Sequence, residues 1–130
     1  INDDKIKTAV LKKSIFAIVK SGTVSLEVCK MNVPSIIIYK MNFINFYLAK
    51  FLLNIKFANM INIINNREVI PELIQSECNA DEIFKSVYYF LKKPNLIAKQ
   101  KQEIKKTLET LSSPSSSSEE AANIILSYIF

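Results

Sequence analysis

The apolar positions of the first forty residues fall into two kinds of pattern. Residues 3–13 carry apolar side chains at helical spacing, which predicts an amphipathic helix. Residues 15–19 and 35–39 are short apolar runs rich in β-branched residues, as is typical of strands buried on both faces. A short helical pattern at 24–31 lies between these runs. The order predicts a β-loop-α-β unit with parallel strands and a right-handed crossover.

The middle of the chain is more uniformly apolar. Residues 40–56 interleave aromatic and aliphatic side chains with lysines, and this stretch is too short and too charged for a membrane span of about 20 predominantly apolar residues. Two interpretations stay open: an interfacial helix whose lysines face anionic lipid, and a core helix whose lysine stems snorkel. We expect a strand or extended loop at 57–64, and a helix over 72–76 with Pro71 in its first turn.

The last third of the chain is predicted to be helical. Asn79 and the acidic residues that follow it are suited to cap a helix that ends near residue 91. A lysine-rich amphipathic pattern predicts a second helix at 96–111. Residues 112–118 read as a serine-rich linker, and the apolar stripe within 119–129 predicts a final helix.

Composition narrows the class of protein. The 130 residues, 49% of them hydrophobic, suffice for one core, and we expect one domain over 1–111, the linker over 112–118 and a helical part over 119–130. The absence of histidine removes the commonest general base and the usual zinc ligand. Cys29 and Cys78 lack metal-ligand spacing, so we expect two reduced, buried thiols and no metal.

The net charge of +5 comes almost wholly from lysine, since Arg67 is the only arginine. Such an excess is compatible with nucleic acid, a membrane surface or a phosphorylated ligand. The basic residues are scattered along the chain and no nucleic-acid-binding motif is present, so we expect no nucleic-acid partner.

One candidate site follows the first predicted strand. Ser21, Gly22 and Thr23 lie between that strand and the next helix, an arrangement that aims backbone N–H groups and a positive helix end at a phosphate. Glu27 lies one helical turn after Thr23, where its carboxylate would accept hydrogen bonds from a ribose diol. The alternative is a common Ser-Gly-Thr turn followed by a solvated glutamate.

A second candidate site is a polar cluster between apolar segments. Its amide and charged side chains are suited to hydroxyl and phosphate contacts, and they are Asn62, Asn65, Asn66, Arg67, Glu68 and Gln75. The alternative is turn chemistry at Asn65-Asn66 together with a surface pair between Arg67 and Glu68.

Several longer motifs resemble the C-terminal part of the lipid-A-disaccharide synthases. Residues 21–27 read Ser-Gly-Thr-Val-Ser-Leu-Glu, residues 46–50 read Phe-Tyr-Leu-Ala-Lys, and residues 67–75 read Arg-Glu-Val-Ile-Pro-Glu-Leu-Ile-Gln. Val33-Pro34, Tyr39-Lys40-Met41 and Asn62 fall in the same order. The chain departs from the family at Ile61, Asn66 and Lys40, where proline, glycine and arginine are usual. We expect Asn66 to adopt the left-handed backbone that glycine would.

The resemblance implies a GT-B glycosyltransferase with two Rossmann-like domains, of which this chain is an incomplete C-terminal half, with parallel strands and flanking helices. The family joins UDP-2,3-diacylglucosamine to 2,3-diacylglucosamine 1-phosphate with inversion and releases UDP, without metal or cofactor. The proposed general base belongs to the N-terminal domain, which we expect to be missing here along with the first strands. We therefore expect this segment alone to be inactive, and no catalytic residue is assigned within it.

The resemblance also assigns roles to residues. Ser21, Gly22 and Thr23 would lie near the diphosphate and Glu27 near the ribose. The donor side of the cleft would be lined by Asn62, Arg67, Glu68 and Gln75. The apolar segment would place the enzyme on the cytoplasmic face of the bacterial inner membrane as a peripheral protein, with the membrane-facing residues Phe43, Phe46, Tyr47, Lys50 and Phe51. The rival hypothesis is a non-catalytic remnant that acts as a membrane-surface or protein-interaction module.

Overall fold

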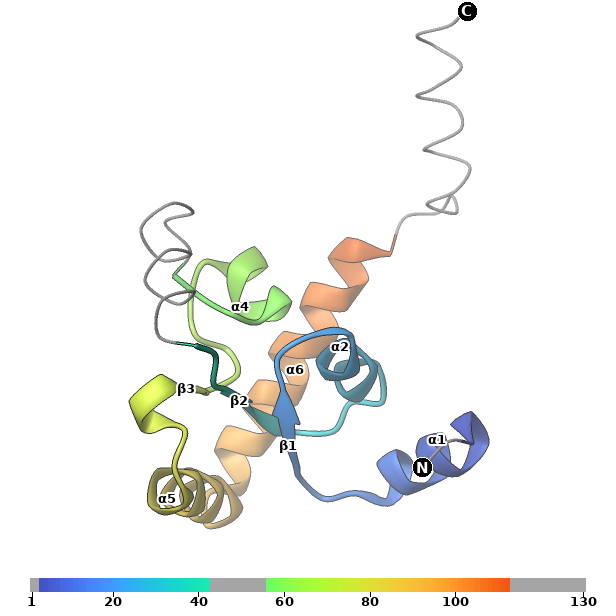
Figure 1. Ribbon diagram of the computed structural model, residues 1–130. Coiled ribbons are helices and arrows are strands. Elements are labelled where there is room, and N and C mark those ends of the chain that lie inside the picture. Colours follow the sequence, from blue (N-terminus) through green and yellow to red (C-terminus); the bar gives the residue numbers. More distant parts are fainter. Residues whose placement is uncertain (1–2, 43–55, 113–130) are drawn as a thin grey trace, which may run out of the picture.

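The computed structural model describes residues 3–42 and 56–112 (Figure 1). Its elements, in chain order, are α1 (Asp4–Lys13), β1 (Ala17–Lys20), α2 (Thr23–Lys30), β2 (Ser35–Tyr39), α4 (Met60–Asn65), β3 (Glu72–Ile74), a 3₁₀ turn (Gln75–Glu77), α5 (Ala80–Leu91) and α6 (Pro94–Leu111). The predictions for residues 43–55 and 113–130, namely the membrane-facing residues, most of the serine-rich linker and the final helix, lie outside the described residues.

The three strands form one parallel sheet in the order β1-β2-β3. Val19 of β1 pairs with Ile37 of β2, and Ile37 pairs on its other side with Glu72 of β3. Helices flank this sheet, so the predicted α/β class with parallel strands is confirmed and is consistent with part of a Rossmann-like half. The local periodicity also placed α1, α2, α5 and α6 within a few residues of their observed bounds.

The expectation of a strand or loop at 57–64 is wrong, because helix α4 begins at residue 60. Asn59 caps this helix, and its Oδ1 accepts a hydrogen bond from the N–H of Ile61 at 2.9 Å. Asn66 ends the helix in the left-handed conformation, with φ of 48°, as we expected for that residue. The run of isoleucines suggested a strand, but the two asparagine caps favour a helix of less than two turns.

The expectation of a helix over 72–76 is also wrong, because Glu72–Ile74 form β3. The carbonyl of Pro71 accepts a hydrogen bond from the N–H of Ile37 at 2.8 Å, which starts the pairing with β2. This pairing joins segments more than thirty positions apart, so the local preference of proline for a first helical turn does not decide the structure.

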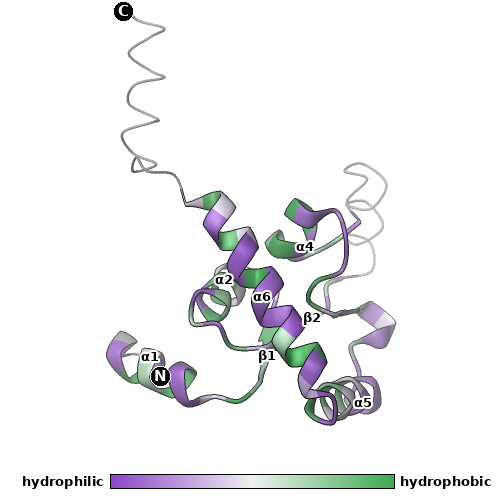
Figure 2. Cartoon of the chain, turned by 180° about the vertical axis from the view of Figure 1, so that it is seen from behind, coloured by the Kyte–Doolittle hydropathy of each residue, from purple (hydrophilic) through white to green (hydrophobic). Residues whose placement is uncertain are grey.

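Helix α6 covers one face of the sheet and crosses it behind β1 and β2 in Figure 1 and in front of them in Figure 2. The core that it helps to bury draws on the sheet, on α2 and on α4: Val19, Val28, Cys29, Val33, Ile37, Ile61, Val69, Ile70 and Ile104. Removing this apolar surface from water is the main favourable contribution to folding. Because α2 and α4 both contact α6, the helix fixes the two helices that start near the carboxyl edge of the sheet.

A buried glutamine of α6 binds the start of β2. The Gln100 Oε1 accepts a hydrogen bond from the N–H of Ser35, and its Nε2 donates to the carbonyl of the same residue, both at 2.9 Å. The side-chain amide therefore satisfies both backbone groups of Ser35 as a neighbouring strand would. This contact fixes where β2 begins beneath α6.

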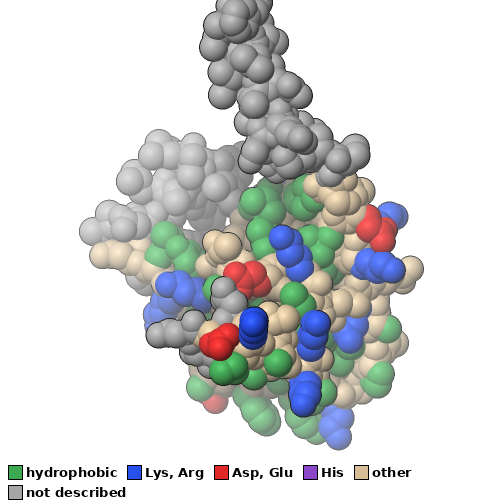
Figure 3. Space-filling model, turned by 90° about the vertical axis from the view of Figure 1, so that its right-hand side faces the viewer, with side chains coloured by type: hydrophobic (Ala, Val, Ile, Leu, Met, Phe, Trp, Pro, Cys, Tyr) green, Lys and Arg blue, Asp and Glu red, His purple; other side chains and the backbone are tan. Residues whose placement is uncertain are grey.

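The outer surface carries both apolar and basic side chains. Leu11 of α1 packs against the core, whereas Ile6 and Val10 of the same helix are exposed. On the face shown in Figure 3, basic side chains are scattered among apolar ones rather than arranged in a stripe. Within the described ranges, no helix is both long and apolar enough to span a bilayer.

Burial of Cys29 predicts a pH-dependent stability. Desolvation raises the pKa of its thiol from 9.0 to about 11, because the core solvates a thiolate poorly. The folded chain therefore keeps this proton when the unfolded chain loses it, so the stabilisation is present below pH 9.0 and is lost as the pH rises toward about 11. Urea denaturation across this range should show the free energy of unfolding falling more steeply for the unsubstituted chain than for Cys29→Ala. Equal slopes would contradict the prediction.

Candidate functional site

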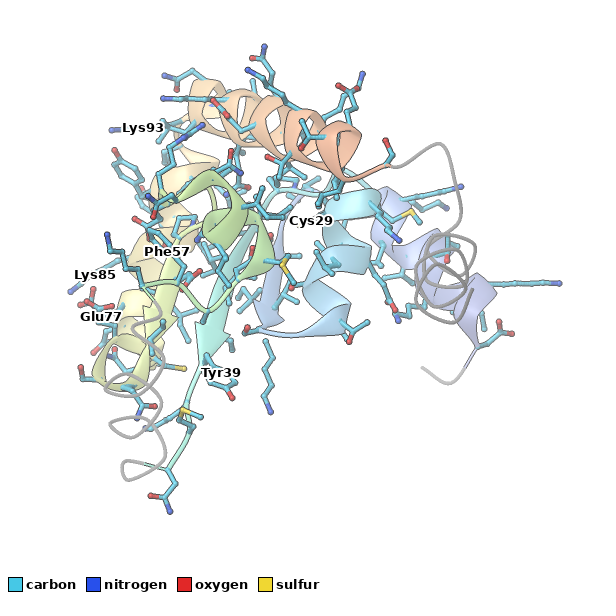
Figure 4. The ribbon with its side chains drawn as sticks, turned by 90° about the horizontal axis from the view of Figure 1, so that it is seen from above. Cys29, Tyr39, Phe57, Glu77, Lys85 and Lys93 are labelled. Carbon is cyan, nitrogen blue, oxygen red and sulfur yellow. The ribbon has the colours of Figure 1, made fainter. Side chains whose placement is uncertain are left out.

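The candidate site lies at the edge of the sheet where the parallel strands end. Ser21 and Gly22 follow β1, Met41 follows β2, and Gln75 follows β3. Tyr39, the last residue of β2, marks this edge in Figure 4. In open parallel sheets, ligands bind outside the carboxyl ends of the strands, so this edge is the place to look for a ligand.

The turn after β1 depends on its glycine. Gly22 has φ of 136° and ψ of −163°, a backbone conformation that residues other than glycine rarely adopt. A Cβ at this position would meet no described heavy atom within 4 Å. The backbone conformation, and not crowding, therefore requires glycine, and among the described residues nothing fills the direction in which a Cβ would point.

The first backbone donors of α2 follow directly after Gly22. The N–H of Ser25 donates to the carbonyl of Gly22 at 3.0 Å, so the N–H groups of Thr23 and Val24 come before the first hydrogen-bonded turn. Both residues are exposed, and neither they nor Ser25 is acidic. Free backbone donors and the positive end of the helix dipole together favour an anion such as a phosphate.

Hydrogen bonds from the opposite side anchor this turn. The Ser21 Oγ donates to the carbonyl of Ala58, and the Ser25 Oγ donates to the carbonyl of Gly22, each at 2.6 Å. The Asn59 Nδ2 then donates to the Ser25 Oγ at 3.1 Å. The Ser21 hydroxyl is thus used within the protein, which leaves the backbone of the turn as the part that faces outward.

Glu72, which the sequence analysis did not single out, connects the turn to the rest of the sheet. Its carboxylate accepts hydrogen bonds from the N–H groups of Ala58 and Asn59, at 2.7 and 2.9 Å, and from the Nδ2 of Asn62 at 2.8 Å. A carboxylate at the start of α4 is also favoured by the dipole of that helix. In the sequence, Glu72 is noticeable only as a member of the 67–75 motif, and the motif does not indicate which groups its carboxylate binds.

Asn62 is fully buried, and its amide is hydrogen-bonded on every side. Its Oδ1 accepts from the N–H groups of Val69 and Ile70, at 2.8 and 2.9 Å, and its Nδ2 donates to the carbonyl of Ile70 at 2.7 Å as well as to Glu72. Two acceptor positions and two N–H groups are all that an amide offers. In this structure Asn62 shapes the loop before β3, and its contact with a sugar donor stays a prediction.

Gln75 joins the ends of β2 and β3. Its Oε1 accepts from the N–H of Met41 at 2.9 Å, and its Nε2 donates to the carbonyl of Met41 at 3.2 Å. The residue is buried and has φ of 54°, a left-handed conformation that turns the chain sharply after β3. Gln75 therefore lies at the carboxyl edge of the sheet, where the candidate site is. Both the oxygen and the nitrogen of its amide bind the backbone of Met41.

Arg67 and Glu68 lie apart from the α2 turn. The Arg67 guanidinium forms an ion pair with Glu103 of α6, so the surface pair between Arg67 and Glu68, which the sequence left open as an alternative, does not form. The Glu68 carboxylate instead accepts from the N–H of Glu72 at 3.1 Å. Both residues line a hollow whose other described walls are Val69, Pro71, Phe90, Leu96, Lys99, Gln100 and Glu103. None of residues 21–24 is among these walls.

Glu27 lies on α2 one turn beyond the anion-binding donors and is half-buried. Its carboxylate forms an ion pair with Lys7 of α1, which was not expected. The described residues include no group of three or more His, Cys, Asp or Glu side chains placed to bind a metal. The site thus combines the first backbone N–H groups of α2 with the carboxylate of Glu27 one helical turn further on.

Replacing Gly22 tests the strained turn. Gly22→Ala should lower the free energy of unfolding by about 1–3 kcal/mol, because alanine is strained at this φ even though its Cβ meets no neighbour. Chemical denaturation gives this quantity directly. The neighbouring exposed change Thr23→Ala serves as control and should stay within about 0.5 kcal/mol. An equal effect of the two changes would refute the assignment of strain to Gly22.

Replacing Asn62 tests the buried network. Asn62→Ala should cost about 3 kcal/mol in the free energy of unfolding, because it leaves buried N–H groups and a carbonyl without partners. The matched change Asn95→Ala removes an exposed amide from α6 and should have little effect. A loss below about 1 kcal/mol for Asn62→Ala would show that the network contributes little to stability.

The sequence comparisons place the chain in one family. A family model described as lipid-A-disaccharide synthetase matches residues 2–126. The lipid-A-disaccharide synthase of Rickettsia bellii is 41% identical over 98 residues, which cover 75% of this chain and 26% of the relative. That of Persephonella marina is 34% identical over 102 residues, covering 78% and 27%. This chain thus spans about a quarter of the length of the relatives that it matches. It belongs to the lipid-A-disaccharide synthase family.

Proposed function

We propose that this chain is the donor-nucleotide-binding part of a lipid-A-disaccharide synthase. The whole enzyme would transfer 2,3-diacylglucosamine from its UDP derivative to 2,3-diacylglucosamine 1-phosphate, with inversion. The observation that carries the proposal is the exposed N-terminus of α2 at the carboxyl edge of a parallel sheet, with Gly22 leaving it open. Family membership supports the reaction class, and the anion-binding geometry supports the part that this chain takes.

The chemistry of glycosyl transfer explains why such a pocket helps. The bond between the anomeric carbon and the diphosphate breaks while the acceptor oxygen bonds to that carbon, so negative charge develops on the departing UDP. The backbone N–H groups of Thr23 and Val24, with the dipole of α2 behind them, would stabilise this charge. These donors need no reorganisation during the reaction, because Ser21, Ser25 and Asn59 already anchor the turn.

Glu27 would accept hydrogen bonds from the ribose hydroxyls. Its position one turn after Thr23 places it beside the diphosphate pocket, and its carboxylate is partly exposed. Lys7 already pairs with this carboxylate, so a ribose would share it with the ammonium group. Asn62, Glu72 and Gln75 would position the walls of the site through the backbone groups that they bind.

The proposal for this chain covers only the donor side of the reaction. The resemblance implies that the general base belongs to the N-terminal domain, so this segment alone should bind nucleotide without transferring sugar. A peripheral position on the cytoplasmic face of the inner membrane follows from the acylated substrates. The predicted membrane-facing segment lies within residues 43–55, outside the described residues.

Titration with UDP tests the proposed nucleotide site. In heteronuclear NMR spectra of the labelled chain, UDP should shift the amide signals of Gly22, Thr23 and Val24 in a saturable manner. Thr23→Glu should lower the affinity at least about tenfold, because it places a carboxylate where the diphosphate binds. The same change should not unfold the chain, since an acidic side chain in a first helical turn is stabilising.

The matched control is Thr23→Gln, which keeps the size of the new side chain without its charge and should retain affinity within about threefold. Uridine lacks the phosphates and should leave the three amide signals unchanged. Absence of saturable shifts with UDP would refute the donor site and favour a non-catalytic remnant. Shifts confined to the hollow beside Arg67 would refute the α2 turn as the diphosphate site.

A further inference from the structure

Helix α5 presents an unusual outer face. Among its twelve described residues none is fully buried, although most are apolar or aromatic. The inner side packs through residues such as Phe90, whose ring lies 5.8 Å from that of Phe16, centroid to centroid. The outer side leaves Phe84 68% exposed, and Tyr88, Tyr89 and Leu91 between 44% and 53% exposed. Four large apolar side chains on one short helix are more than isolated surface positions.

Lysines lie among these exposed rings. The rings of Phe84 and Tyr88 stack with centroids 5.9 Å apart. The Nζ of Lys92 lies 5.4 Å from the centroid of the Tyr88 ring, and that of Lys93 lies 4.0 Å from the Tyr89 ring. We call the exposed surface formed by these residues, together with Lys85 and Leu91, the α5 outer face. Figure 4 shows Lys85 and Lys93 on the same outer side of the molecule, away from α1.

We propose that the α5 outer face contacts the surface of an anionic bilayer. Tyrosine and lysine suit this environment, because each has an apolar body that can enter the boundary of the acyl chains and a polar end that stays among the headgroups. Phenylalanine and leucine on the same helix face add apolar area that would be buried in the bilayer, as in interfacial amphipathic helices. The lysine ammonium groups would meet the lipid phosphates.

Charge favours an anionic surface. Asp81 and Glu82 are the acidic residues of α5, and the Glu82 carboxylate already binds the Nζ of Lys85 at 2.7 Å. Lys92 and Lys93, at the other end, face rings rather than carboxylates. The net charge of +5 for the chain would add long-range attraction to anionic lipid. The lipid nature of the partner rests on the proposed function, whose substrates are acylated.

Vesicle co-sedimentation of the full chain tests the proposal. The chain should bind vesicles that contain phosphatidylglycerol more tightly than vesicles of phosphatidylcholine. The double change Phe84→Ser and Tyr88→Ser should weaken binding to the anionic vesicles about tenfold or more, because two exposed rings no longer enter the bilayer. Unchanged binding by this variant, or absence of binding by the unsubstituted chain, would overturn the proposal.

The matched control removes two exposed apolar residues from another helix. Ile6→Ser with Val10→Ser on α1, residues 52% and 48% exposed, should change vesicle binding less than about twofold. Reversal of charge by Lys92→Glu and Lys93→Glu should abolish the preference for anionic over zwitterionic vesicles. An equal loss in the α1 variant would show nonspecific apolar adsorption and would also overturn the assignment to α5.

Two further measurements separate the remaining outcomes. The UDP titration of the Phe84→Ser and Tyr88→Ser variant should match that of the unsubstituted chain, because α5 contributes no residue to the α2 turn. A failure of UDP binding with intact vesicle binding would thus refute the nucleotide site alone. Sedimentation velocity without lipid should show a monomer. A dimer that the same double change dissociates would assign the face to a second copy of the chain instead.

Discussion

The carboxylate of Glu72 is the contact on which the arrangement of the site depends. It joins the first residue of β3 to the N–H groups that open α4 and to the buried amide of Asn62. Asn62 in turn binds the backbone on both sides of Ile70 in the loop that leads into β3. If either partner were removed, several buried groups would lose hydrogen bonds at once, which costs more than any one of these bonds contributes. A strand of three residues and a helix of six are thereby held in one arrangement.

The consequence for the site is a division between support and contact. Side chains hold the α2 turn in place. Ser21 and Asn59 join the turn to residues 58 and 59, whose backbone N–H groups Glu72 also binds. The proposed contact surface is backbone, because Gly22 has no side chain and the N–H groups of the next two residues precede the helix hydrogen bonds. Backbone donors recognise an anion by charge and geometry, and the side chains that fix their positions here bind other parts of the protein.

Most of the correct predictions rest on local patterns, and most of the missed contacts are long-range. The parallel unit of β1, α2 and β2 follows from apolar runs and helical spacing, and the turn at residues 21–23 follows from its place after a strand. The predictions for 57–64 and 72–76 were wrong for different reasons. The caps of α4 at Asn59 and Asn66 are local signals, but the run of isoleucines suggested a strand. The pairing that forms β3 joins Pro71 to Ile37 across the fold. The pairing of Arg67 with Glu103, 36 positions along the chain, is equally invisible in one sequence. Residues that bind distant backbone groups, such as Glu72, have no periodic signal.

The connection between β3 and α5 gives the exposed aromatic face a defined orientation. Gln75 follows β3 directly and binds Met41 across the carboxyl edge. It begins a single 3₁₀ turn, after which Asn79 caps α5. Phe90 packs on Phe16 just before β1, and α5 also contacts α6, so the helix is fixed at both ends to the sheet. A bilayer held at the outer side of α5 would consequently set the angle between the membrane and the carboxyl edge of the sheet. Under the proposed function, this fixed angle would let the sugar diphosphate of an acylated donor reach the α2 turn while its chains remain in lipid.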